Sequence, residues 1–448
     1  MKKKYSILAV LLPAVVAVIL LGATTPQSPA ATASSFKSDS NQITKDSTDE
    51  IVKNVDDLTP SFSGAFAQVP LDQIDALKAQ GRQVVEVNLV AKAVDLPIMG
   101  GGTYHALTYN GQVPGPTVRV SQGDIIKVTL TVPSTEYTPH SIDMHASQVS
   151  ATNFGAVKPG ENRTYAYIAE VPGTFKYHCE GVNVAGMDQH VFSGMYGMTI
   201  VDPVNGYNPL IVDKTDVVNG KVVVVHHRYE AAAKEFVLEY NQLYLNSDGS
   251  YDQQAMFLHN TTQSVVNGFA FGYVPNSDIN KLVKGDPNKN IFVAQPWNDA
   301  SLKQYQAHPL FVDTGVHYRI FVENEGQMPV FFHIVGEILH RVTQGNHVQA
   351  QGTETWLIGG SQGAIIDEVF DNPGVYVAVN HDYAAIFTGA ATVFVAGDPF
   401  NLGYGPGDMA NPSDAVPPAG MNTIPQKQVL HCLCSDDRAA EIAKTMGA

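Results

Sequence analysis

One short stretch of the chain carries the side chains best suited to binding a redox metal. It holds an adjacent histidine and cysteine, followed closely by a second histidine and a methionine: His178, Cys179, His190 and Met195. One thiolate with imidazole partners and a weak thioether is the donor set of an electron-transferring blue-copper centre. The second imidazole that such a centre needs is available upstream, at His140 or His145. One of that pair is then left over together with His178, which suggests a second metal.

Each of these residues also has an ordinary structural explanation. A buried cysteine is most often a small hydrophobe, and a histidine is most often a hydrogen-bonded core or surface residue. The combination favours copper, because a histidine pair precedes the His-Cys dipeptide and the other cysteines, Cys432 and Cys434, lie far away.

Strand geometry predicts that His178 and Cys179 bind two different metals. Neighbouring residues of a strand point to opposite faces, so if Cys179 faces the interior of its own β-sandwich, His178 faces outward. An outward imidazole can hold a metal only with help from another surface, whether a second domain or a second subunit. The bond between the two residues would then connect the two metals.

His140 and His145 divide in the same way, because their separation of five residues is odd. We therefore assign His140 to the blue copper, with Cys179, His190 and Met195. His145 and His178 remain for the second metal. A catalytic site usually takes three protein ligands and keeps one position open, and His381 is the natural third ligand.

The elements that must position these residues are short strands with Gly and Pro between them. Regular short strands of this kind predict β-sandwiches or barrels. The expected strands are Val84 to Leu89, Ile125 to Val132, Thr164 to Ile168, Gly197 to Val201, Val222 to His226, Ile320 to Val322, Val375 to Val379 and Ala391 to Ala396. Helices are expected only at Leu71 to Gln80 and Ala439 to Met446.

A weak internal repeat predicts two copies of one domain. The segment from Val171 to His178 and the segment from Asn372 to His381 share a Pro-Gly turn, a strand carrying aromatic residues and a histidine at the strand end. The second copy has no cysteine, so it cannot build a blue-copper site. The expected organisation is a signal peptide at 1–33, a flexible polar tether at 34–60, a first domain at 61–203, a second at 204–400 and a C-terminal tail at 401–448.

The first residues predict export. Three lysines precede an apolar core of about 15 to 17 residues, and small residues follow at a position suited to cleavage. The alternative is an uncleaved membrane anchor, and in either case the body lies outside the cytoplasm. A periplasmic, pseudoperiplasmic or extracellular location is expected, with membrane tethering if the leader is retained.

Composition limits the partners. The formal net charge of −16 argues against nucleic acid and would favour a basic redox donor. Cys432 and Cys434 form a CxC pair, which is a strained disulfide. The pair either binds or relays copper or is a tail with two thiols, and its role is left unassigned.

Several motifs together resemble the copper-containing nitrite reductases with two cupredoxin domains, a branch of the multicopper oxidase superfamily. The resemblance extends from about Tyr104 to Asp398. Its motifs are Asn110-Gly111-Gln112-Val113-Pro114-Gly115-Pro116, His140-xx-Asp143-x-His145, His178-Cys179, His190 with Met195, Phe332-His333-Ile334-Val335-Gly336 and Val379-Asn380-His381. The first motif alone marks copper oxidases in general.

The resemblance implies an all-β chain of two tandem cupredoxin-like Greek-key β-sandwiches that binds two coppers. The implied type 1 copper ligands are His140, Cys179, His190 and Met195. The implied type 2 copper ligands are His145, His178 and His381, the last supplied by a neighbouring subunit of a homotrimer. Asp143 and His333 correspond to the pair that delivers protons to nitrite, and Val335 lies where the family usually has a bulkier aliphatic residue over the substrate.

The implied reaction is the one-electron reduction of nitrite to nitric oxide and water, as in denitrification, with electrons passing from type 1 to type 2 copper. It takes two protons, and a carboxylate and a histidine near an open metal position meet that demand. Without the motifs, Asp143 would read as a loop carboxylate and His333 as a core histidine. A small cupredoxin or cytochrome is the expected donor, although the loop after Cys179, with Glu180 and Asn183 to Ala185, departs from the usual pattern and leaves the partner open.

Three alternatives carry different predictions. A two-domain multicopper oxidase that reduces dioxygen needs several His-x-His pairs, and the chain has none. A blue-copper electron carrier would not need the second set of histidines. A two-copper oxidoreductase acting on another small nitrogen species, such as hydroxylamine, fits the ligands equally well.

Overall fold

A computed structural model describes residues 69–99, 102–149, 155–181, 186–274 and 309–398. All of these residues belong to one unit that begins at Val55. The predicted leader, the tether, the tail with Cys432 and Cys434 and the helix from Ala439 to Met446 lie outside the described residues. None of the helices in the described ranges is long and apolar enough to cross a membrane.

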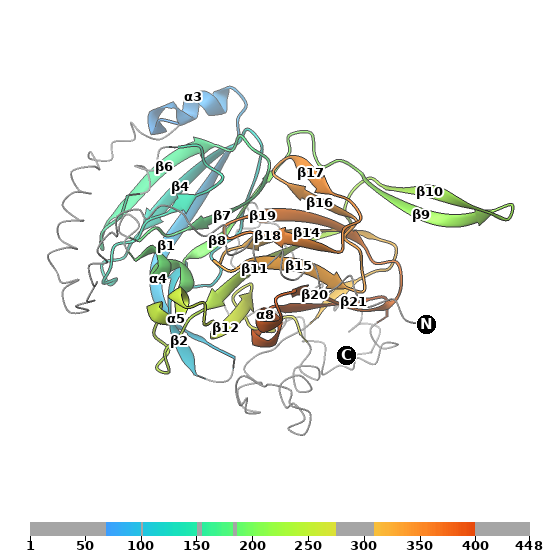
Figure 1. Ribbon diagram of the computed structural model, residues 1–448. Coiled ribbons are helices and arrows are strands. Elements are labelled where there is room, and N and C mark those ends of the chain that lie inside the picture. The colour runs from blue at the N-terminus through green and yellow to red at the C-terminus, as the bar shows by residue number, and fades with distance from the viewer. Residues whose placement is uncertain (1–68, 100–101, 150–154, 182–185, 275–308, 399–448) are drawn as a thin grey trace, which may run out of the picture. The chain divides into compact units, whose positions relative to one another are not determined.

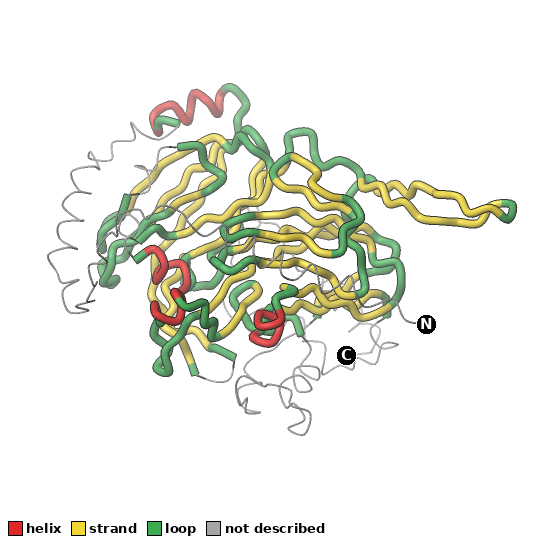
Figure 2. Tube along the Cα trace, viewed as in Figure 1, coloured by secondary structure: helices red, strands yellow, loops and turns green. Residues whose placement is uncertain are grey.

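The first half of the described chain forms a sandwich of two four-stranded sheets (Figures 1 and 2). One sheet has the strand order β2-β1-β4-β6 and the other β3-β8-β7-β5. The strands are β1 (Val84–Pro97), β2 (Thr103–Tyr109), β3 (Val118–Ser121), β4 (Ile125–Thr131), β5 (Asp143–Met144), β6 (Asn162–Ile168), β7 (Gly173–His178) and β8 (Tyr196–Asp202).

Alternation along β4 illustrates how the sequence builds this sandwich. Ile126, Val128 and Leu130 are buried in the core between the sheets, whereas Lys127 and Thr129 between them are only partly buried. Cys179 and Met195 belong to the same core, so the predicted thiolate does face the interior of its own sandwich.

The second half forms a larger sandwich of a six-stranded and a five-stranded sheet. Their orders are β12-β11-β14-β19-β16-β17 and β13-β21-β20-β15-β18. The strands are β11 (Lys234–Leu243), β12 (Gln263–Val266), β13 (Leu310–Val312), β14 (His317–Asn324), β15 (Val330–Val335), β16 (Arg341–Gln344), β17 (His347–Ala350), β18 (Thr355–Ile358), β19 (Gly363–Val369), β20 (Gly374–Asn380) and β21 (Ala391–Ala396).

Every strand expected from the sequence is present, and the chain is all-β as predicted. The two repeated segments form β7 and β20, which each begin at the glycine of a Pro-Gly pair. β7 ends on His178, and β20 ends one residue before His381. The boundary at 203/204 stays a prediction.

Helices are few and short among the residues that the structure describes. The expected first helix is present as a 3-10 turn, η2 (Leu71–Gln73), that continues into α3 (Ile74–Ala79). The others are α4 (Met187–Phe192), α5 (Gln253–Phe257) and α8 (Tyr383–Thr388). Asp382 caps α8 by accepting the backbone N–H of Ala384, so this helix begins two residues after His381.

A buried charge cluster joins the two sandwiches. β7 packs against β14 and β19, and Lys176 Nζ donates to the Glu325 carbonyl oxygen at 2.5 Å. The Glu325 carboxylate lies 3.9 Å from the same ammonium, and both side chains are almost fully buried. Glu239 and Glu323 are buried nearby. The strand that ends on His178 is therefore held by a charge in the second sandwich.

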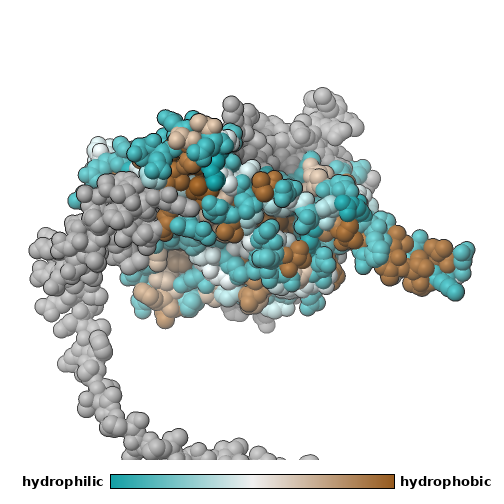
Figure 3. All heavy atoms as spheres, turned by 90° about the horizontal axis from the view of Figure 1, so that it is seen from above, coloured by the Kyte–Doolittle hydropathy of each residue, from teal (hydrophilic) through white to brown (hydrophobic). Residues whose placement is uncertain are grey.

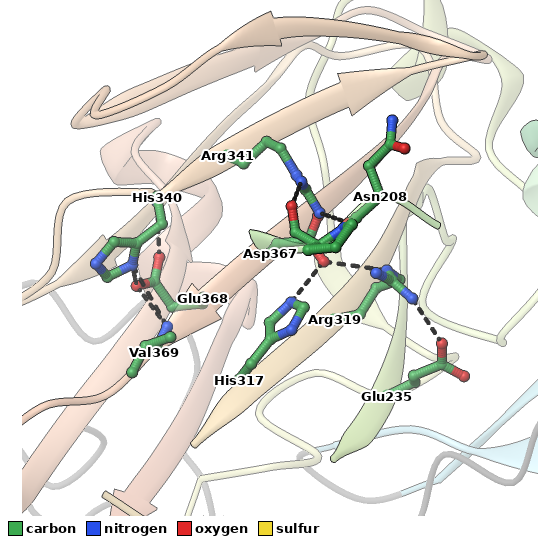
Figure 4. Close-up of polar contacts among 10 residues, drawn as sticks. Asn208, Glu235, His317, Arg319, His340, Arg341, Asp367, Glu368 and Val369 are labelled. Carbon is green, nitrogen blue, oxygen red and sulfur yellow. Dashed lines mark hydrogen bonds and ion pairs between the residues drawn. The ribbon is translucent and has the colours of Figure 1, made fainter. Parts of the chain in front are cut away.

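A second buried network holds β14, β16 and β19 together (Figure 4). Asp367 accepts from His317 at 2.8 Å, Arg319 at 3.1 Å and Arg341 at 2.8 Å. Burial acts to raise the pKa of Asp367, but these three partners lower it below its usual value. Arg341 also donates to the carbonyl oxygens of Pro209 and Asn208, at 2.8 and 3.0 Å.

A separate hairpin follows directly from Asn208 and Pro209. Its strands are β9 (Leu210–Val218) and β10 (Lys221–Tyr229), and it extends away from the second sandwich (Figure 1). Asn219 and Gly220, both with positive φ, form the two-residue turn that suits the twist of a hairpin. At its base Leu210 and Val212 pack on Val369.

Candidate copper sites

Three of the predicted metal ligands meet inside the first sandwich, and the fourth, Met195, lies in the same core. The Nδ1 atoms of His140 and His190 lie 3.2 Å apart, and the Cys179 sulfur lies 3.1 Å from His190 Nδ1. Met195 is fully buried in the same core, and its carbonyl oxygen accepts the Cys179 N–H at 3.1 Å. The thiolate cluster (His140, Cys179, His190 and Met195) is therefore formed by one chain alone.

Each ligand of the thiolate cluster comes from a different local structure. His140 pairs with Val157 in an isolated bridge, and Cys179 directly follows β7. His190 lies on α4, which the Gly186 N-cap begins with a positive φ of 73°. Pairing of β5 with β7 brings the segment of His140 to Cys179, whereas His190 lies only eleven residues beyond Cys179 in the sequence.

Burial keeps both imidazoles of this cluster neutral. It lowers the pKa of His140 to about 3, with a smaller contribution from His190, and it lowers the pKa of His190 to about 4. A metal ligand must be deprotonated, so neutral imidazoles are ready to bind. The Thr138 hydroxyl lies 3.3 Å from His140 Nε2, so the other ring nitrogen, Nδ1, is the one that faces His190.

Backbone groups surround the cysteine sulfur. The N–H groups of Ser141 and Gly181 point at it, at 3.3 and 3.2 Å. Burial raises the pKa of the Cys179 thiol, and these two donors lower it. Hydrogen bonds of this kind tune the potential of a metal bound to the sulfur.

A second group of ligands lies outside the core of the first sandwich. The Nε2 atoms of His145 and His178 approach to 3.0 Å, and an Asp143 oxygen lies 3.6 and 3.8 Å from them. We call Asp143, His145 and His178 the imidazole pair cluster. Asp143 and His178 are direct partners across β5 and β7, which explains why this short strand forms.

The tautomer of His178 follows from its neighbour. Its Nδ1 lies 3.1 Å from the Cys179 carbonyl oxygen, which can only accept, so the ring carries its proton on Nδ1. The Nε2 lone pair then points toward His145. An imidazole fixed by a backbone carbonyl in this way is typical of a metal ligand.

Within this cluster the pKa values of the imidazoles and of the carboxyl shift in opposite directions. Burial, assisted by Lys176, lowers the pKa of His178 to about 3 and of His145 to about 4. Burial also raises the pKa of Asp143 to about 7, with Glu180 raising it further and Lys176 lowering it. A carboxyl whose pKa lies near 7, beside neutral imidazoles, is suited to donate a proton at a metal site.

The peptide bond between His178 and Cys179 connects the two clusters. Cys179 points into the core and His178 points away from it, so adjacent residues belong to different ligand groups. His140 and His145 divide in the same manner, although β5 and a turn, not one regular strand, separate them.

The remaining predicted site residues lie on the second sandwich. His333 and Val335 are alternate residues of β15, and His381 follows β20, whose Asn380 pairs with Phe332. The rings of His333 and His381 lie 5.4 Å apart. His333 Nδ1 donates to the Glu354 carbonyl oxygen at 2.5 Å, and Val335 is half-exposed.

Within a single chain His381 does not join the imidazole pair cluster. Among the described residues, three-ligand groups form only at the thiolate cluster and at Asp143, His145 and His178. His381 itself is exposed. Its predicted role therefore depends on a second copy of the chain.

Sequence reasoning missed three residues that tune these groups. Ser141 donates to the sulfur, the Glu354 carbonyl orients His333, and Lys176 carries a charge beside His178. Only Lys176 had a readable signal, because residues two apart on a strand share a face. Residues 182–185, which include Asn183 to Ala185, lie outside the described residues.

Comparison with known proteins agrees with this arrangement. Residues 91–206 match the multicopper oxidase family. A solved copper nitrite reductase from Nitrosomonas europaea superposes with a TM-score of 0.55 at 29% identity, covering 73% of this chain and all (100%) of that one. Two tandem cupredoxin-like sandwiches with a buried thiolate cluster are typical of copper proteins that resemble the multicopper oxidases.

Within that class, the chain is a relative of the copper-containing nitrite reductases, as the motifs predicted. The enzyme of that name from Rhizobium sullae is 29% identical over 341 residues, which cover 73% of this chain and 80% of that protein. The one from Alcaligenes xylosoxydans xylosoxydans is 43% identical over 109 residues, 24% of this chain and 32% of its own length. Copper fits the donor set of one soft sulfur with neutral imidazoles.

Proposed function

We propose that this chain is an enzyme that reduces nitrite to nitric oxide and water, moving one electron per turnover between two coppers. The observation that carries the proposal is the adjacency of His178 and Cys179. Cys179 belongs to a buried thiolate cluster suited to electron transfer, and His178, directly before it, belongs to a partly open cluster that contains a carboxyl. The names of the relatives support nitrite as the substrate.

The thiolate cluster is proposed to hold the type 1 copper. His140, Cys179 and His190 would supply the three strong ligands, and Met195 the weak axial thioether. Their almost complete burial supports this role, because a dry, rigid site limits reorganisation when the metal changes charge.

His145 and His178 are proposed to hold the type 2 copper together with His381 from a second copy, giving two coppers per chain in the assembly. Two imidazoles leave a catalytic site one ligand short. His381 is exposed on the second sandwich, and apolar side chains beside it, Phe331 and Leu357, are exposed as well. An exposed apolar surface next to a ligand supports a subunit interface there.

A closed homotrimer is the assembly that we propose. One copy would offer the imidazole pair cluster of its first sandwich, and the next copy would offer His333 and His381 of its second sandwich. Such a contact joins different surfaces, so it is head-to-tail and closes only as a ring.

Asp143 and His333 are proposed to deliver the two protons. Copper, when bound, supplies the electron and a Lewis acid that holds the anion. The Asp143 carboxyl, with a pKa near 7, can donate from its protonated form at neutral pH. The Nδ1–H of His333 donates a hydrogen bond to the Glu354 carbonyl oxygen, which leaves Nε2 to exchange protons with the substrate or its water.

Val335 is proposed to line the substrate pocket. It lies two residues after His333 on the same face of β15 and is half-exposed. A valine is smaller than the aliphatic residue that relatives are expected to carry there, so the pocket would admit anions slightly larger than nitrite.

The surrounding biology is also a proposal. We infer an exported protein that acts in denitrification and receives electrons from a small cupredoxin or cytochrome. The acidic chain, with a net charge of −16, would attract a donor with a basic surface.

The decisive experiment compares the wild type with His381→Ala and with His347→Ala, an exposed histidine elsewhere on the second sandwich. Copper per chain, the thiolate absorption band and nitric oxide release under a chemical reductant are measured together. His381→Ala is expected to fall from two coppers to one, keep its thiolate colour and lose nitric oxide release, whereas His347→Ala retains all three. One copper in the wild type with no nitric oxide would instead support an electron carrier.

A further inference from the structure

A histidine and a methionine bring two further metal-binding atoms together on the second sandwich. The Nδ1 atom of His259 lies 2.7 Å from the sulfur of Met328. His259 is exposed and Met328 is partly buried. In the part of the chain that the structure describes, neither of these two atoms has another hydrogen-bond partner. We call His259 and Met328 the His-Met pair, and it is separate from both copper clusters.

The backbone of His259 has a conformation that a side chain makes costly. Its φ is 56°, and it lies just beyond the end of α5. Its N–H donates to the Met256 carbonyl oxygen at 3.1 Å, and the N–H of Asn260 donates to the Ala255 carbonyl oxygen at 2.8 Å. These two bonds form a Schellman ending, in which glycine usually takes the left-handed position. Residues that keep a left-handed conformation despite a side chain concentrate at ligand-binding positions.

The loop that carries Met328 is held in place by side chains. Gln242 Oε1 accepts the N–H groups of Gln327 and Met328 at 3.1 and 3.3 Å, and Asn324 Nδ2 donates to the Met328 carbonyl oxygen at 2.8 Å. Gln327 Nε2 donates at 2.9 Å to the Met256 carbonyl oxygen, the same oxygen that closes the end of α5. The supports of the two donor atoms are therefore tied to each other, which pre-organises the pair.

The chemistry of the two atoms favours a soft metal ion. A thioether is only a weak hydrogen-bond acceptor, so a hydrogen bond alone gives little reason to hold a histidine in a left-handed conformation. Thioether sulfur selects Cu(I), and imidazole also binds copper. Metal–ligand bonds of about 2.0 to 2.3 Å place two donors of one ion roughly 3 to 4 Å apart, so a slight opening of the pair admits an ion. Donor atoms converge in the same way in the copper clusters, where His145 and His178 approach to 3.0 Å.

Exposed apolar side chains do not by themselves mark this position. Phe257 and Leu258, directly before His259, are 69% and 67% exposed. Hydrophobic residues are also scattered over the face drawn in Figure 3, and several lie on the β9–β10 hairpin. Single exposed apolar residues are normal on a protein surface. The converging donor atoms, rather than the apolar surface, distinguish the end of α5.

We propose that the His-Met pair is a surface binding site for Cu(I), distinct from the two copper clusters. The pair supplies two donors and leaves positions open toward solvent, so an ion bound there can exchange, unlike one enclosed in the buried thiolate cluster. Such a site is suited to capture copper from solution. The inference goes beyond the proposed function and does not rest on it, because neither donor takes part in nitrite reduction.

Two substitutions and a control test the site. His259→Gly removes the imidazole and supplies the residue that most easily adopts a left-handed φ, so folding is retained. Met328→Leu removes the sulfur and nearly conserves volume. His347→Ala removes an exposed histidine elsewhere on the second sandwich. The copper-loaded full chain of each protein is titrated with Cu(I) in the absence of oxygen, in competition with bicinchoninate, whose coloured complex reports the Cu(I) that the protein leaves unbound.

The wild type is expected to take up a further Cu(I) ion per chain, beyond its resident copper. Both site variants should weaken this uptake by about tenfold or more, because loss of even an outer-shell partner typically costs that much affinity. His347→Ala should bind as the wild type does, and an excess of Zn²⁺ should not displace the ion. Urea unfolding is the folding control, and His259→Gly is expected to keep the wild-type midpoint. Absence of further uptake by the wild type, or full affinity in either site variant, would overturn the proposal.

A second measurement shows whether the sulfur itself binds the ion. The methionine methyl groups of the full chain are labelled with ¹³C, and the Met328 resonance is identified by its absence from Met328→Leu. Ag⁺, a soft ion without redox chemistry under these conditions, should shift this resonance in the wild type and shift it less in His259→Gly. Thiolate absorption confirms that the resident copper stays bound. An unshifted Met328 resonance would overturn the proposal. Neither measurement uses nitrite, so failure of the proposed function would leave both results unchanged.

Discussion

Lys176 offers the sharpest test of how the two sandwiches hold each other. Its ammonium donates to the Glu325 carbonyl oxygen at 2.5 Å and lies 3.9 Å from the carboxylate of the same residue. The side chains are 4% and 0% exposed, and Glu239 and Glu323 are buried nearby. Lys176→Met keeps a side chain of similar length and removes the positive charge that faces these carboxyl groups.

The expected loss of folding free energy depends on the buried carboxyl groups that remain without a partner after the substitution. Removing one partner of a buried ion pair typically costs about 3 to 5 kcal/mol, because the other charge is left unpaired. Burial already raises the pKa of Glu323 and Glu325, and Lys176 acts to lower it. A carboxyl whose folded pKa lies above its unfolded value loses stability as the pH rises above the unfolded value. The deficit of Lys176→Met is therefore expected to be larger at pH 8 than at pH 5.5.

Urea unfolding of the copper-free full chain at both pH values measures this deficit. Lys127→Met is the matched control, since Lys127 pairs with Glu86 at 3.1 Å on the surface, with side chains 33% and 59% exposed. An exposed pair of this kind is expected to cost less than about 1 kcal/mol. An equal loss of unfolding free energy in both variants at pH 8, or a Lys176→Met deficit that grows as the pH falls, would contradict this role of Lys176.

Three further substitutions test the metal sites and the junction. Asp143→Asn is expected to lower the rate of nitric oxide formation by about 10²- to 10⁴-fold with both coppers retained. The wild-type rate is expected to decline as the pH rises through the Asp143 pKa of about 7, and this decline should be absent from the variant. Loss of copper from this variant would contradict a proton-donating role. Met195→Leu conserves volume and removes a weak donor that favours oxidised copper, so redox titration should give a higher potential with the thiolate band retained, and an unchanged potential would exclude Met195 as a ligand. Gly363→Ala would put a Cβ 2.3 Å from the Thr174 carbonyl oxygen and should cost about 1 to 3 kcal/mol in urea unfolding, whereas Gly374→Ala, whose nearest neighbour lies at 3.5 Å, should cost less.

Local patterns were enough to predict the strands of this protein. β4 reads as alternating apolar and polar residues, and the Pro-Gly pairs before β7 and β20 mark where those strands begin. Such signals are local, since side-chain alternation and turn chemistry act over a few residues. The β9–β10 hairpin was anticipated only as an apolar strand near Val222, because nothing in a single strand tells whether it joins a sheet or projects from it.

The sequence by itself determined the chemistry of the candidate sites. One cysteine beside a histidine, with alternation along the strand, was enough to divide His140, Cys179 and His190 from His145 and His178. Only the tertiary structure decided the distances and the environment, because these depend on chain segments that are far apart in sequence. Burial in the core lowers the pKa of the imidazoles, Lys176 is buried against Glu325 of the second sandwich, and His381 lies on a surface that a single chain does not bring to its partners. Charge, burial and solvent access are properties of the packed molecule, so no pattern of residues could supply them.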